Sequence, residues 1–234
     1  MGAEPARRAP GLFRAALLIA AKDLRIELRT RSALYSALAF TVLAVVIFYF
    51  AWDPTAVGSI QLAPGVLWVI FTFSGLLGLN RSFSLEQGDR ALDALLASPV
   101  DREAIFLGKA FGNLVFVCLV QLCAIPAVAL FYNLPLTGVW PALAALTFAA
   151  AIGLVSVGTL FSAMATNTRL AELLLPMLAL PFFVPVVMPA AQVTARLLAG
   201  RPMDEAWPWL RILLAFDVVF LVACTLAFPY TLEE

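Results

Sequence analysis

Six long stretches of the chain carry almost only apolar side chains, and polar residues gather between them. Each stretch has roughly the 20 residues that a helix needs to cross a bilayer core about 30 Å thick. Polar and apolar positions do not alternate within them, as they would in the strands of a membrane barrel. The pattern predicts an all-α integral membrane protein, a bundle of six transmembrane helices at 33–52, 60–79, 110–132, 139–164, 173–191 and 209–228.

Composition agrees with this class. Hydrophobic residues make up 63% of the chain and charged residues 13%, against about 25% charged in soluble domains. The formal net charge of zero averages over segregated groups, because 19 of the 30 charged residues lie in 1–31 and 80–109. We expect the bilayer, and no nucleic acid, among the partners.

The positive charges predict the orientation. Twelve of the fifteen Lys and Arg residues lie before the first span, in 80–109, or at Arg169. The other three are Arg196, Arg201 and Arg211. Because cytoplasmic loops carry the excess of Lys and Arg, both termini and the 80–109 segment are assigned to the cytoplasm. The longest external connection is then 192–208.

The amino-terminal arm precedes a single transmembrane domain, 32–230. Residues 1–11 are expected to be a disordered leader. In 12–31, apolar residues recur at helical spacing, which predicts a cytoplasmic helix lying in the headgroup plane; they are Leu17, Ala21, Leu24 and Leu28. Arg14 and the run KDLRIELRTR interrupt the apolar core that a cleaved signal would need. The helix can be a basic topology anchor, a functional element, or both.

The segment 80–109 is the one long charged stretch between the spans. Ser84 followed by Gln87 fits a capping box, Glu86 and Arg90 are spaced as an ion pair, and Pro99 ends the predicted helix. A second helix start follows at Asp101. Either the leucines of the first helix cover the underside of the bundle, or they dock a soluble partner that transmits force. The candidate docking residues are Ser84, Glu86, Asp89, Arg90, Leu92, Asp93, Leu95, Leu96 and Pro99.

Signatures of catalysis are missing. The chain has no histidine, which removes the commonest general base and metal ligand. No GxxxxGK[ST] motif is present, so the chain does not hold ATP by a P-loop. Gly108 and Gly112 form a GxxxG pair, which favours close helix packing. The chain is therefore expected to be a non-catalytic subunit, with no metal site and with cysteines that serve as small core residues.

Two features inside the spans invite a functional interpretation. Asp217 lies mid-span in LLAFDVVFL, where a charged Asp costs roughly 2.5–3.5 kcal/mol. It must face the bundle or a wet cavity, either as structural polar glue or as part of a substrate or proton pathway. Pro181, Pro185 and Pro189 predict a kinked or broken fifth span. Together with the connection that follows, they suggest an external gate made of short or re-entrant pieces.

Four segments in order resemble one known family. KDLRIELRTR before the first span, LNRSF with the acidic helix that follows, LLASPVDREAIFLGK leading into the third span, and LLAFDVVFL near the end are similar to CcmB. This family is the permease subunit of the cytochrome c maturation ABC complex. The resemblance covers about residues 20–230.

The resemblance implies a fold of the ABC-2 exporter type in the bacterial inner membrane, with 80–109 containing the coupling helix. It implies a separate CcmA-like ATPase that carries the ATP, CcmC- and CcmD-like membrane subunits, a CcmE-like haem chaperone, and two copies in the complex. Without histidine, the usual axial ligand of haem, the chain alone is expected to bind no cofactor, and haem belongs to the complex. The alternatives are an ABC-2 exporter for a lipid, drug or polysaccharide, and a secondary transporter or membrane scaffold.

Overall fold

The computed structural model describes residues 11–88, 100–135, 137–165 and 171–231, with backbone alone for 81–88 and 171–174. These residues form helices and contain no strand. Six of the helices are long and apolar enough to cross a membrane, which confirms the predicted all-α class. The helices are α1 (Leu12–Thr30), α2 (Ser32–Ala51), α3 (Ser59–Gly88), α5 (Arg102–Tyr132), α6 (Trp140–Ala165), α7 (Ala171–Leu198) and α8 (Met203–Thr231).

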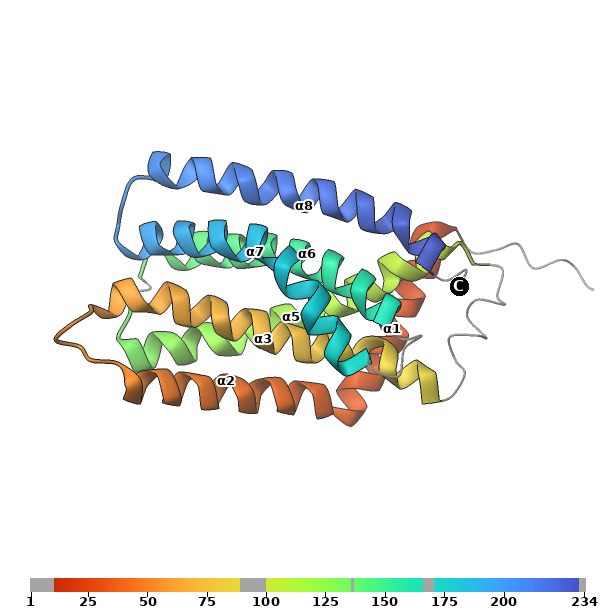
Figure 1. The fold of residues 1–234 in the computed structure, drawn as a ribbon, viewed down its shortest axis with the longest axis horizontal. Coiled ribbons are helices and arrows are strands. Elements are labelled where there is room, and N and C mark those ends of the chain that lie inside the picture. The colour runs from red at the N-terminus through yellow and green to blue at the C-terminus, as the bar shows by residue number, and fades with distance from the viewer. Residues whose placement is uncertain (1–10, 89–99, 136, 166–170, 232–234) are drawn as a thin grey trace, which may run out of the picture.

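The six long helices lie side by side, and α1 lies across one end of the bundle (Figure 1). The last residues of α3, the first residues of α5 and the last residues of α8 meet at this end, which we call the α1 end. The α2–α3 and α7–α8 connections lie at the opposite end, called the hairpin end (Figure 1). The charge pattern predicts the same arrangement, because it assigns α1 and the segment 80–109 to one side of the membrane. The residues that flank 89–101 do lie at the α1 end.

Helix α1 turns into α2 at one residue. Arg31 adopts the left-handed conformation, with φ 53°, and the backbone N–H of Leu34 donates to Glu27 Oε1 over 3.0 Å. The predicted leucine positions do not form the packing face, because Leu17 and Leu28 are each 59% exposed. Small side chains pack on the bundle instead, which lets the two backbones approach closely; the buried residues are Ala15, Ala16, Ile19 and Ala20.

Helix α3 is longer than predicted. It continues without interruption from the span to Gly88, so the predicted helix start at Ser84 is wrong. The residues from Arg81 to Gln87 include neither proline nor glycine, and a capping box starts a helix only where the preceding residues are not already helical. Helix α5 does begin directly after Asp101, although that side chain makes no capping hydrogen bond.

Helix α7 is continuous through all four of its prolines. The predicted re-entrant pieces and the long 192–208 connection are therefore wrong, since α7 extends to Leu198 and α8 begins at Met203. Each proline removes one backbone donor and bends the helix, and Figure 1 shows α7 changing direction along its length. Because α7 packs against α3, α6 and α8, tertiary contacts hold a helix that local preference alone would break.

Burial divides the spans into inner and outer helices. In the membrane-spanning stretches of α3 and α6, 67% of the residues are buried. In those of α2 and α8, 28% and 22% of the residues are buried. The outer helices expose large apolar side chains such as Phe50 and Val218. In a membrane these faces meet lipid or another subunit. The inner helices hold the polar contacts described next.

Candidate functional site

Most of the candidate docking residues cannot be placed. Those that lie outside the described residues are Asp89, Arg90, Leu92, Asp93, Leu95, Leu96 and Pro99. Ser84 and Glu86 lie in the last two turns of α3. The borders of the segment are nevertheless clear, because α3 ends at Gly88 and α5 begins at Arg102. A force on the segment between them therefore acts on both helices at the α1 end.

Helix α1 contacts the first turns of α5 closely. A Cβ atom added to Gly108 would lie 2.7 Å from the carbonyl oxygen of Ala16 and 2.8 Å from Cβ of Ile19. Gly112, one turn later, faces Ala20 and Asp23 at 3.7–3.9 Å. The GxxxG pair therefore acts as a packing site, as predicted, and its partner is the interfacial helix. Side chains at Gly108 would force α1 away from the bundle.

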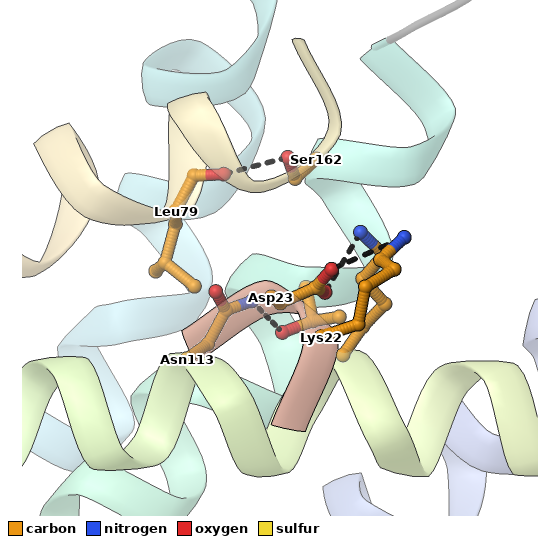
Figure 2. A network of polar contacts seen from close by, with 7 residues as sticks. Lys22, Asp23, Leu79, Asn113 and Ser162 are labelled. Carbon is orange, nitrogen blue, oxygen red and sulfur yellow. Dashed lines mark hydrogen bonds and ion pairs between the residues drawn. The ribbon is translucent and has the colours of Figure 1, made fainter. Parts of the chain in front are cut away.

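A buried ion pair reinforces this contact. Lys109 Nζ lies 2.9 Å from Asp23 Oδ2, with the Lys109 side chain 1% exposed and that of Asp23 20% exposed. Lys22 Nζ approaches the other Asp23 oxygen at 3.3 Å, and Figure 2 shows Lys22 directed at this carboxylate. Burying a charge is costly unless it is paired. The Asp23 carboxylate is therefore one partner that stabilises Lys109 inside the bundle.

Two hydrogen bonds extend the contact to α6 and α3. Asn113, one turn after Lys109, donates from Nδ2 to Thr159 Oγ1 over 3.0 Å. Ser162 on the same face of α6 donates to the carbonyl oxygen of Leu79 over 2.8 Å (Figure 2). We call the side chains of Asp23, Lys109, Asn113, Thr159 and Ser162 the α1-end network. It links α1, α5, α6 and α3.

One more hydrogen bond joins the start of α5 to α8. Arg102, the first residue of α5, donates from Nη1 to the carbonyl oxygen of Pro229 in α8 over 3.0 Å. The first turns of α5 are therefore bonded to α8 through Arg102, to α1 through Lys109 and to α6 through Asn113.

Asp217 lies inside the bundle. Its side chain is 5% exposed, and it packs against Gly153 of α6, where an added Cβ would collide with the carboxyl group and with Val186 of α7. This satisfies the prediction that it faces the bundle. Neither carboxyl oxygen has a hydrogen-bond partner within the described part of the chain. Its role in a pathway stays a prediction.

The other candidate groups do not assemble into a site. Pro181, Pro185 and Pro189 lie along the continuous helix α7, and a gating role for them is not tested. Cys118, Cys123 and Cys224 are free thiols. Across residues 11–88, 100–135, 137–165 and 171–231, no cluster of His, Cys, Asp and Glu could hold a metal ion.

Sequence reasoning missed the α1-end network. Lys109 was placed in the loop, because the apolar run begins only at Ala110. Asn113, Thr159 and Ser162 are polar residues inside apolar spans, and such residues tend to bond between helices. That signal was available. The signal for Asp23 was hidden, since it lies between Lys22 and Arg25 on a helix that looks solvent-facing.

Six spans with a helix across one end, joined there in part by polar contacts, define a multi-pass membrane protein. Within that class the chain belongs to the CcmB protein family, which matches residues 14–234. The resemblance inferred from the four sequence segments is thereby confirmed.

Individual relatives agree. The chain is 32% identical over 212 residues to heme exporter protein B of Paracoccus denitrificans, covering 91% of each chain. It is 30% identical over 184 residues to heme exporter protein B of Rhodobacter capsulatus, covering 78% of this chain and 84% of that one. The protein of the same name from Pseudomonas aeruginosa is 26% identical over 198 residues.

Proposed function

We propose that this chain is the membrane-spanning subunit of an ABC-type haem exporter that acts in cytochrome c maturation. The similarity to heme exporter protein B over nearly the whole chain carries the proposal. In this proposal the protein spans the inner membrane of a bacterium, and the α1 end faces the cytoplasm. The charge pattern supports this orientation, because twelve of the fifteen Lys and Arg residues precede the first predicted span, lie in the sequence segment 80–109, or are Arg169.

A separate ATPase supplies the energy in this proposal. The sequence has no P-loop of its own, so the work must be delivered from outside the chain. The end of α3 and the segment between α3 and α5 form the proposed docking element, with Ser84, Glu86, Leu92 and their neighbours in contact with the ATPase. The α1-end network lies where α5 leaves that segment, which supports a role in passing on the ATPase movement. CcmC-, CcmD- and CcmE-like proteins are the further proposed partners, in a complex with two copies of this chain.

Co-purification with a CcmA-like ATPase tests the docking element. The variant carries Glu86→Lys, Asp89→Lys and Asp93→Lys, and we expect it to lose both association and stimulation of ATP hydrolysis. The matched control reverses three acidic charges near the hairpin end, at Asp53, Asp204 and Glu205, and should keep both. If wild type and the first variant associated equally with the ATPase, the proposed docking element would be refuted. Full transport without any ATPase would reject the ABC assignment.

Haem binding is expected to differ between the isolated chain and the assembled complex. We propose that the chain alone holds no resident haem, because it has no histidine to serve as the usual axial ligand. Titrating haem into the purified chain should give no stoichiometric shift of the haem absorption band, whereas the assembled complex should give one. A one-to-one shift with the chain alone would contradict this part of the proposal.

A further inference from the structure

Two cavities follow the same pair of helices, α3 and α7. One, of about 640 Å³, lies at the hairpin end between the start of α3 and the end of α7. The other, of about 370 Å³, is lined by Gly65 to Phe73 of α3 and Leu180 to Ala191 of α7. Gln61 of the first and Gly65 of the second are one helical turn apart, and Ala191 and Gln192 are neighbours. We call this pair of cavities the α3–α7 seam.

The cavity at the hairpin end, which we call the outer cavity, is cationic. Its polar lining residues are Ser59, Gln61, Gln192, Arg196 and Arg201. Arg201 forms an exposed ion pair with Glu205 over 3.2 Å, so its charge is partly compensated. Arg196 has no ion-pair partner among the described residues. The outer cavity therefore has one positive charge available to an anion.

Arg196 is held in place with donors to spare. Its Nη1 donates to both the backbone and side-chain oxygens of Gln192 over 2.8 Å, and its guanidinium lies 5.7 Å from the ring centre of Trp209. Its Nε is buried and has no hydrogen-bond partner in the described part of the chain. Arginine presents its donors in a rigid fork suited to phosphate. The side chain is thus oriented beforehand, with a donor left unsatisfied.

The second cavity, which we call the inner cavity, is apolar and opens at the side of the bundle. On α3 the positions Gly65, Val69 and Phe73 recur every four residues, and all three are exposed. On α7, Val184 and Met188 are 55% and 54% exposed. These side chains belong to the membrane-spanning stretches of α3 and α7. Gly65 borders open space, because a Cβ added there would meet no atom within 4 Å.

A hydrogen bond fixes the back of the seam. Trp68 donates from Nε1 to Thr194 Oγ1 over 2.9 Å, and both side chains are buried. This bond ties α3 to α7 between the two cavities. Trp68 also lines the inner cavity, so this bond joins the two helices beside it.

We propose that the α3–α7 seam binds an anionic phospholipid of the leaflet at the hairpin end. The phosphate would lie on Arg196 in the outer cavity, and one acyl chain would follow Gly65, Val69 and Phe73. From Gln61 to Phe73 the helix rises about 18 Å at 1.5 Å per residue, close to half of a hydrocarbon core about 30 Å thick. A lipid matches the seam in charge, apolarity and length. This inference is independent of the proposed haem export.

Native mass spectrometry of the purified chain, released from detergent with phosphatidylglycerol or zwitterionic phosphatidylethanolamine, tests the proposal. We expect the wild type to retain about one phosphatidylglycerol and to prefer it about fivefold, which corresponds to about 1 kcal/mol. Arg196→Gln should remove the preference, and Arg196→Lys should keep part of it. Gly65→Phe should abolish retention while leaving Arg196 intact, by filling the inner cavity.

Two matched variants serve as controls. Arg211→Gln removes a charge near the hairpin end from a side chain that stacks on Trp207 and does not line the seam. Val218→Phe enlarges a side chain that is 65% exposed on α8. Both should retain lipid as the wild type does. Retention of phosphatidylglycerol unchanged by both Arg196→Gln and Gly65→Phe would overturn the proposal, as would equimolar haem displacing the lipid from the wild type.

Discussion

Breaking the ion pair between Asp23 and Lys109 should loosen α1 from α5. The two atoms are 2.9 Å apart, with Lys109 1% and Asp23 20% exposed. Coulomb's law gives about 6 kcal/mol at an effective dielectric constant of about 20, and about 1.4 kcal/mol at about 80. Asp23 keeps some contact with solvent and with Lys22. We therefore expect an interaction energy of about 2–3 kcal/mol, toward the lower side of the cost of breaking a fully buried pair.

A double-mutant cycle measures this energy. Asp23→Asn, Lys109→Met and the combined variant are unfolded in mixed detergent micelles, with tryptophan fluorescence as the signal. Asp23→Asn should lower the free energy of unfolding by about 3 kcal/mol, because the Lys109 ammonium loses its carboxylate in a buried position. The combined variant should lose clearly less than the sum of the single variants, since it buries neither charge.

The pair between Arg201 and Glu205 provides the control. Its side chains are 59% and 46% exposed, so solvent screens their attraction and the same cycle should give below about 1 kcal/mol. If the cycle for Asp23 and Lys109 gives no more than this exposed pair, the buried ion pair does not hold α1, and the reasoning above is refuted.

Four further substitutions test the packing and the interior. Gly108→Ala should destabilise the protein by about 1–3 kcal/mol through overpacking, whereas Gly65→Ala, in open space, should change stability by less than about 1 kcal/mol; thermal melting of both in detergent compares them. Asp217→Asn should assemble normally but lose transport, and full activity in reconstituted vesicles would remove its proposed functional role. Trp68→Phe should cost about 0.5–1.5 kcal/mol by removing the hydrogen bond to Thr194, as measured by the shift in the unfolding midpoint.

The span boundaries show where local reasoning succeeds. The stretches 33–52 and 139–164 agree within one residue with α2 and α6, because an apolar run between polar ends has one clear place in a bilayer. Hydropathy underestimates the length of the helices that extend beyond the bilayer. Helix α3 continues into polar sequence as far as Gly88, where hydropathy no longer reports on helix formation.

Helix α7 shows where local reasoning fails. Four prolines predicted a broken span, yet the helix is continuous. Proline lowers the stability of an isolated helix, but the lost hydrogen bonds are outweighed when neighbouring helices pack on both sides. The packing partners of α7 come from distant parts of the chain, and no local pattern reveals them.

The sequence by itself determined the class, the number of spans, the grouping of charges at one end and the family. The class and the number of spans follow from a local rule, since every backbone group in lipid must be satisfied within its own helix. Only the tertiary structure decided that Asp23 pairs with Lys109, that Asn113 reaches Thr159, and that α3 and α7 form a seam ending at Arg196. Helices in lipid associate through close packing and hydrogen bonds between particular faces, and those faces are selected by residues far apart in the chain.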